Sequence, residues 1–153
     1  MKKIILLALL FSFSASTLVI AQTKTSQEEM FAATYHSSKI AVNSQHYQFV
    51  ANVIHNSQER EILDGAINEI RINKLDVEGQ LHGFSKDKVV NTLKDSNSKI
   101  ETEFNDDNQE ITITIETKVY AINIVVKPNG NAFLTLTGNG SSKLLYTGKL
   151  VQR

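Results

Sequence analysis

The last third of the chain alternates regularly between apolar and polar residues. Apolar side chains occupy every second position from Ile111 to Ile115 and, after a break near Thr117, from Tyr120 to Val126. A period of two is typical of a β-strand with one buried face. Because the apolar positions move from odd to even numbers, a turn is expected near Thr117.

The segment Lys127-Pro128-Asn129-Gly130 predicts a hairpin turn after the second of these strands. A type I turn with Gly130 left-handed in a bulge keeps the apolar residues of both strands on one face. A two-residue Asn-Gly turn would mix the faces. With a five-residue loop at 138–142 added, the expected pairs are Val126–Ala132, Ile124–Leu134, Ile122–Leu136, Leu136–Leu144, Leu134–Tyr146 and Ala132–Gly148.

The beginning of the chain after residue 25 predicts a helix and then a strand. Ser26-Gln27-Glu28-Glu29 has the spacing of a capping box, which favours a helix from about Gln27 to Lys39. From His46 the apolar positions recur at every second residue as far as Val53, which indicates an extended strand.

The middle of the chain is less regular. Weaker strands are expected within 66–75, 77–81 and 100–104. Ser85 is expected to cap a second short helix, with Phe84 packing on Val89 as a hydrophobic staple.

These elements predict a mostly β fold. The chain has 153 residues, of which 41% are hydrophobic and 21% charged, and this suits one globular domain. We expect an antiparallel sandwich or a small, partly open barrel with an N-terminal helix. The alternative is an α+β domain in which the helix packs on an open antiparallel sheet.

The first residues have the pattern of a secretory signal peptide. Lys2 and Lys3 precede an apolar run from Ile4 to about Phe13, and small residues then lead to Ala21. Cleavage after Ala21 makes residues 1–21 the signal peptide and residues 22–153 a single β-rich domain. Serines interrupt the apolar segment, so a membrane anchor is disfavoured. The mature protein is therefore expected in the periplasm or outside the cell, without a membrane anchor after cleavage.

Composition and spacing argue against several chemistries. The 16 basic and 16 acidic residues cancel, so no nucleic-acid partner is expected. The absence of Cys excludes disulfides and thiolate metal sites. The Asp106-Asp107-Asn108 segment lacks the order of a calcium loop. The histidines also lack the spacing of a zinc motif, so no metal or cofactor is expected; they are His36, His46, His55 and His82.

Two segments resemble a known family. The first is Tyr47-x-Phe49-Val50-Ala51, and the second is the closing pattern from Tyr120 through Gly130 to Leu150. They are similar to an exported Bacteroidota family catalogued as domain of unknown function four-two-five-one. The resemblance implies a small, predominantly β, exported domain that is often lipid-anchored and has no established activity. This chain lacks the lipoprotein Cys, and its segment 75–84 departs from the family's Leu-Pro-Tyr-like pattern.

The aromatic residues on the apolar strand faces are the candidate binding residues, namely Tyr47, Phe49, Tyr120 and Tyr146. They either fill the core or, in a closed barrel, line a pocket for an apolar ligand. The predicted function is a non-catalytic, exported binding module of the bacterial envelope. Its partner would be a small apolar molecule, a protein or another envelope component. The alternative is a small periplasmic enzyme that uses a histidine and a carboxylate.

Overall fold

The computed structural model describes residues 26–138 and 143–153, which form one helix followed by ten strands. The helix spans residues 26–43 and is therefore somewhat longer than its capping box and pattern predict. The predicted signal peptide and residues 22–25 lie outside the described residues. The strands are β1 (His46–His55), β2 (Arg60–Ile62), β3 (Glu69–Asn73), β4 (Asp76–His82), β5 (Val90–Asp95), β6 (Lys99–Asn105), β7 (Glu110–Glu116), β8 (Tyr120–Val126), β9 (Asn131–Gly138) and β10 (Leu144–Gln152).

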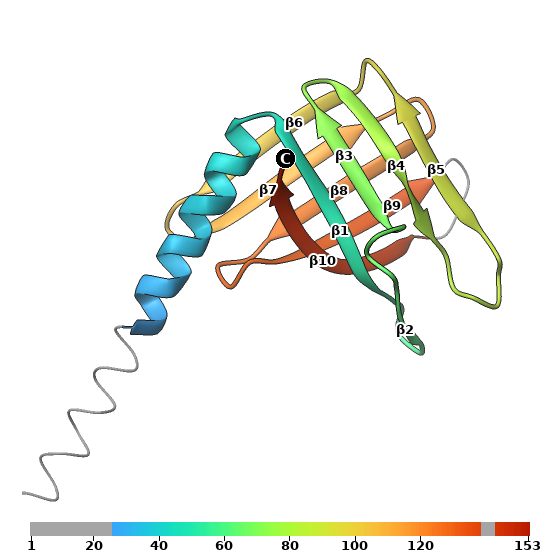
Figure 1. The fold of residues 1–153 in the computed structure, drawn as a ribbon, viewed down its shortest axis with the longest axis horizontal. Coiled ribbons are helices and arrows are strands. Elements are labelled where there is room, and N and C mark those ends of the chain that lie inside the picture. Colours follow the sequence, from blue (N-terminus) through green and yellow to red (C-terminus); the bar gives the residue numbers. More distant parts are fainter. Residues whose placement is uncertain (1–25, 139–142) are drawn as a thin grey trace, which may run out of the picture.

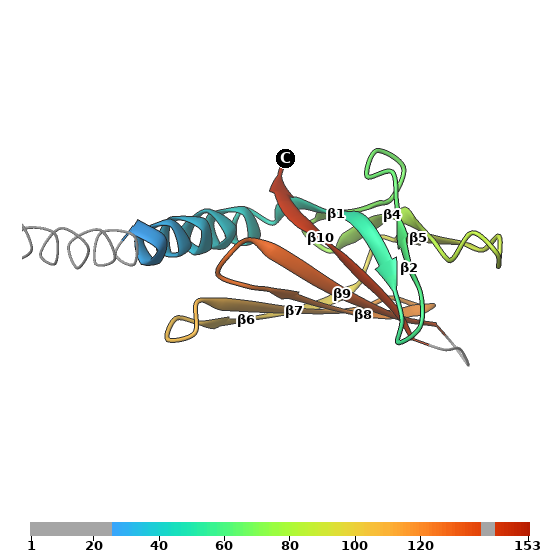
Figure 2. The ribbon, with the colours of Figure 1, turned by 90° about the horizontal axis from the view of Figure 1, so that it is seen from below.

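The strands form one antiparallel sheet in the order β5-β4-β3-β1-β10-β9-β8-β7-β6, and the short β2 pairs with β1. The sheet curls into a half-barrel, so that the β1–β3–β4–β5 part faces the β6–β9 part (Figure 1, Figure 2). The expected mostly β, partly open architecture with an N-terminal helix is confirmed. β5 and β6 follow each other in the chain but form the two ends of the sheet order.

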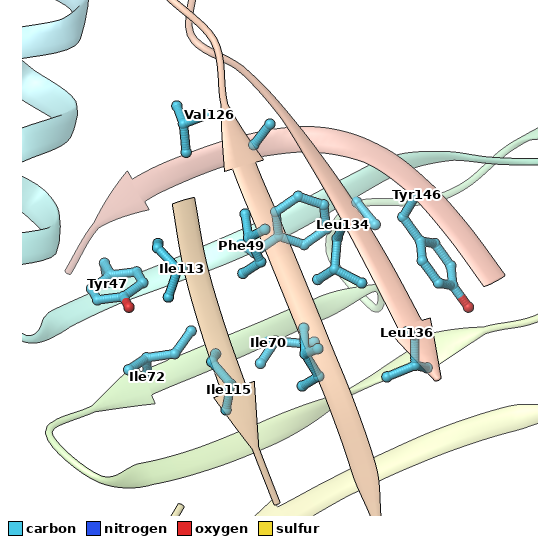
Figure 3. Close-up of a cluster of buried hydrophobic side chains, with 14 of the residues drawn as sticks. Tyr47, Phe49, Ile70, Ile72, Ile113, Ile115, Val126, Leu134, Leu136 and Tyr146 are labelled. Carbon is cyan, nitrogen blue, oxygen red and sulfur yellow. The ribbon is translucent and has the colours of Figure 1, made fainter. Parts of the chain in front are cut away.

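The core lies inside this curl. Ile111, Ile113 and Ile115 of β7 are fully buried, as their alternation with threonine predicts. They belong to the same cluster as Phe49 of β1 and Ile70 of β3, which lie on the opposite wall (Figure 3). The buried faces of the two halves thus pack against each other.

The C-terminal hairpins have the expected register. Val126 pairs with Ala132, and Gly130 has a φ of 80°, as the bulged type I turn requires. The Gly130 amide donates to the Lys127 carbonyl oxygen at 2.9 Å. Across the next strand pair, Leu134 lies opposite Tyr146. Residues 139–142 of the predicted loop lie outside the described residues.

The short helix expected at Ser85 is absent, and residues 85–88 form a turn. The Ser85 amide and hydroxyl both donate to the Glu61 carboxylate, at 2.9 and 2.7 Å, so Ser85 caps no helix. The Gly83 amide donates to the Val89 carbonyl at 2.8 Å, which closes the loop between β4 and β5. The segment is therefore a hairpin connection, and the residues after it form β5.

Within residues 26–138 and 143–153, the structure shows no helix of the length and apolar character needed to cross a membrane.

Candidate functional site

Two side chains of the helix, Tyr35 and Lys39, bind Asp106 in the turn that follows β6, and we call these contacts the Asp106 latch. The Tyr35 hydroxyl and the Lys39 ammonium each donate to Asp106 Oδ1, both at 2.7 Å. The Lys39 ammonium also lies 5.3 Å from the ring centroid of Phe104. Lys39 and Tyr35 hold the pKa of Asp106 below its usual value, whereas burial and Asp106 raise the pKa of Tyr35 to about 12. The latch sets the distance between the helix and the unpaired side of β6.

A cleft of about 280 Å³ opens where the helix ends between the two halves of the sheet. Its apolar walls come from Ile72 of β3 and from Ile100 and Phe104 of β6. Tyr47 of β1 and Lys74 of the β3–β4 turn contribute polar groups. Asn43, Gln45 and Thr102 also line it, so the cleft combines apolar side chains from both halves of the sheet with several polar ones, and both kinds of contact are available to a small molecule.

The Tyr47 hydroxyl is the notable polar group of the cleft. Tyr47 is only 2% exposed, and burial raises its pKa to about 12. Its hydroxyl makes no hydrogen bond with any residue that the structure describes. The oxygen is not fully enclosed, so part of its surface remains accessible. Because water can reach this hydroxyl, it is not an unsatisfied group, and a polar atom of a ligand in the cleft can take the place of that water as its hydrogen-bond partner.

Two residues at the rim of the cleft have left-handed backbones. Gln45, after the helix, has a φ of 57°, and Lys74 has a φ of 55°. The Lys74 amide donates to the Gln45 carbonyl oxygen at 2.8 Å. This bond joins the end of the helix to the β3–β4 turn and fixes both backbones beside the cleft.

The four aromatic candidates occupy three different environments. Tyr47 lies at the cleft, at the far end of the buried cluster from Tyr146 (Figure 3). Phe49 is fully buried in the centre of the core. Tyr146 is also fully buried, and its hydroxyl donates to the His82 carbonyl oxygen at 3.0 Å; burial raises its pKa. Tyr120 is half-buried on β8. The fold therefore does not gather these residues around one site.

Sequence reasoning missed the cleft residues of β6. Ile100, Thr102 and Phe104 line the cleft, while Glu101 and Glu103 between them are exposed. This alternation is visible in the sequence, because successive strand residues point to opposite faces. What the sequence does not show is that this strand faces Tyr47, which lies far from it along the chain.

The histidines do not form the pair that the alternative enzyme would need. His82 Nδ1 lies 2.9 Å from Asn68 Oδ1, and His55 Nε2 lies 3.3 Å from Thr147 Oγ1. Among residues 26–138 and 143–153, no histidine forms an ion pair with a carboxylate. The same residues contain no group of three side chains placed to hold a metal ion.

Two other hollows are less suited to a ligand. One, of about 490 Å³, lies between the helix, the β8–β9 turn and the end of β10. The other, of about 320 Å³, lies over β3, β4 and β5, where Arg71 is paired with Glu69 at 2.6 Å. Neither is lined by an aromatic residue, and neither has a buried hydroxyl comparable with that of Tyr47.

These features define a curled antiparallel β domain whose open side is flanked by an N-terminal helix. Comparison with family models finds no match. Comparison with curated proteins also finds none. Among solved structures, the chain is similar to a DUF4251 family protein from Bacteroides eggerthii DSM 20697, a domain of unknown function.

The alignment with that structure has a TM-score of 0.68 and covers 79% of this chain and 89% of the other. Sequence identity is 16%, so the likeness establishes a shared fold. This neighbour carries the name of the family that the sequence resembles, and the resemblance is confirmed at the level of the fold.

Proposed function

We propose that this domain is a non-catalytic binding module of the bacterial envelope that holds a small apolar molecule in the cleft beside Tyr47. Placement in the envelope rests on the signal-peptide pattern of residues 1–21. Binding rests on one observation above the others, namely that Tyr47, a 2%-exposed residue whose hydroxyl has no hydrogen-bond partner among the described residues, lines the cleft.

The chemistry of the cleft limits the ligand. Its volume of about 280 Å³ lies near the lower end of ordinary ligand sites, which span roughly 300–1,000 Å³. Ile72, Ile100 and Phe104 offer apolar contact, and Tyr47 offers one hydrogen bond. A single short apolar chain or ring system with one polar end satisfies both features.

Binding of the neutral fluorescent probe N-phenyl-1-naphthylamine tests the proposal. The probe is expected to gain fluorescence on binding the wild-type domain. Tyr47→Phe keeps the ring and removes the hydroxyl, so affinity for a ligand that uses this bond should fall about three- to tenfold, the value of one net hydrogen bond. Tyr120→Phe is the matched control, because Tyr120 does not line the cleft.

A second pair of variants tests the location. Thr102 lines the cleft from β6, and Thr102→Phe should fill the space and abolish probe binding. Glu101→Phe adds the same ring to the neighbouring, exposed position and should leave probe binding in the cleft unchanged. Undiminished binding by Thr102→Phe would place the probe elsewhere and refute the cleft as the site.

A further inference from the structure

The charge of the cleft is set by one residue. Among the described residues that line it, Lys74 is the one with an ionisable charge at neutral pH. Its ammonium forms no ion pair with any residue that the structure describes. The acidic residues of the adjacent strand, Glu101 and Glu103, alternate with the cleft residues and lie on the exposed face of β6.

From this arrangement, and resting on the proposed function, we propose that the ligand is an amphiphile with an anionic head group, which binds Lys74 while the apolar part extends between Ile72 and Ile100. The Tyr47 hydroxyl then donates to an oxygen of the same head group or to a polar atom just below it. A cationic head group would meet the ammonium, and no carboxylate among the described residues of the cleft lining would compensate it.

The backbone of Lys74 is fixed in the β3–β4 turn beside the cleft. Asn73 pairs with Asp76, so Lys74 and Leu75 form a two-residue hairpin turn. Turns of this kind place a residue at positive φ, where glycine is the favoured choice and a lysine is strained. The Lys74 amide also donates to the Gln45 carbonyl oxygen at 2.8 Å, so the backbone from which this side chain extends is fixed beside the cleft.

A charge series on one apolar chain tests the head-group chemistry. Decanoate and decylammonium, each below its micelle concentration, and decanol, below its solubility limit, are titrated by calorimetry or by displacement of N-phenyl-1-naphthylamine. We expect the wild-type domain to bind decanoate about three- to tenfold more tightly than decanol, and decylammonium most weakly, with the preference for decanoate reduced by added salt.

Variants of Lys74 locate the preference. Lys74→Gln should bind decanoate and decanol equally, because the charge that distinguishes the two head groups is removed. Lys74→Gly should behave in the same way. Because glycine adopts the positive φ of this position without steric cost, this variant is expected to fold. Lys88→Gln is the matched control, because Lys88 has a φ of 50° but does not line the cleft; it should keep the full preference.

The outcomes separate this inference from the proposed function. Equal binding of the three compounds by the wild type, or an unchanged preference in Lys74→Gln, would refute the proposal that the ligand has an anionic head group. The proposal that the cleft binds a small apolar molecule would then still hold. Failure of decanoate, decanol and the naphthylamine probe to bind at all overturns both proposals.

Discussion

Gly148 lies where β10 crosses the bulge of β1, and replacing it with alanine should weaken the joint between the two halves of the sheet. Gly148 pairs with Ala51, and the next pair is Thr147 with Val53, so Asn52 is the extra residue of the bulge. A Cβ atom at position 148 would lie 2.0 Å from the Val50 carbonyl oxygen and 3.0 Å from the Ala51 Cα atom.

The cost follows from which atoms are in the way. The atoms nearest the added methyl group belong to the backbone of β1, so no change of side-chain rotamer relieves the contact. To lengthen the 2.0 Å contact to even 3.0 Å, the strands must move apart by 1 Å at a point where they are hydrogen-bonded. Overpacking a core commonly costs about 1–3 kcal/mol, and we expect about 3 kcal/mol or more here because the obstacle is backbone.

Urea-induced unfolding of the wild type, Gly148→Ala and Gly83→Ala measures this cost. At Gly83, the nearest atoms to an added Cβ are 3.4 and 3.5 Å away, so that variant should be unchanged or up to about 1 kcal/mol more stable through the unfolded chain. A failure of Gly148→Ala alone to fold would agree with the expectation. A loss of less than about 1 kcal/mol in Gly148→Ala would refute the argument that the close approach of backbones requires glycine.

Two further substitutions test the hairpin turn and the loop between β5 and β6. Gly130→Ala should lose about 1 kcal/mol or more because φ is 80°, whereas Pro128→Ala should lose less; equal melting of Gly130→Ala and the wild type would contradict the bulged turn. The Asp95 carboxylate accepts a hydrogen bond from the Lys118 amide at 2.9 Å, and this bond lowers the pKa of Asp95. The stabilisation by the charged carboxylate is therefore complete above the ordinary aspartate pKa of 3.8. It is lost as the pH falls through the lower pKa of the folded state. Asp95→Asn should therefore be less stable than the wild type at neutral pH, and the difference should shrink below pH 3.8. Thermal melts at a series of pH values measure this. The control is Asp107→Asn, which should show no such difference because Asp107 is exposed and makes no hydrogen bond or ion pair with the described residues.

The C-terminal strands are predictable because their determinants are local. From Ile111 to Val126 the period of two identifies both strands and their buried faces, and the turn chemistry at Gly130 selects the register. Each piece of information lies within a few residues of the contact it specifies. The observed pairs, such as Ile124 with Leu134, follow without knowledge of the rest of the molecule.

The error at residues 85–90 has the opposite cause. Ser85 followed by charged residues is typical of a helix start, but its amide and hydroxyl bind Glu61, which is distant in the sequence. Val90 then pairs with His82 across the sheet. Strand pairing outweighed a weak local preference, as tertiary contacts commonly do.

The cleft could not be predicted for a related reason. Its walls come from the end of the helix, β1, β3 with its turn, and β6, so no single segment carries its pattern. The sequence correctly places Tyr47 on the apolar face of its strand. It does not distinguish Tyr47, whose hydroxyl has no described partner, from Tyr146, whose hydroxyl is satisfied by the His82 carbonyl oxygen.

The position of the cleft follows from the way the sheet ends. The loop from β5 to β6 is fixed on both sides, by Asp95 to the Lys118 amide and by the Ser98 amide to the Leu75 carbonyl oxygen at 3.0 Å. β6 therefore starts close to the β3–β4 turn but leaves β5 without pairing to it, and the open side of the curl has no strand to close it. The helix lies beside this side and contacts it through side chains, as in the hydrogen bond from Tyr35 to Asp106. The helix ends at residue 43. Because a helix closes such a gap by side-chain packing rather than by a continuous ladder of backbone hydrogen bonds, space remains where the helix stops, and Tyr47 and Lys74 both line that space.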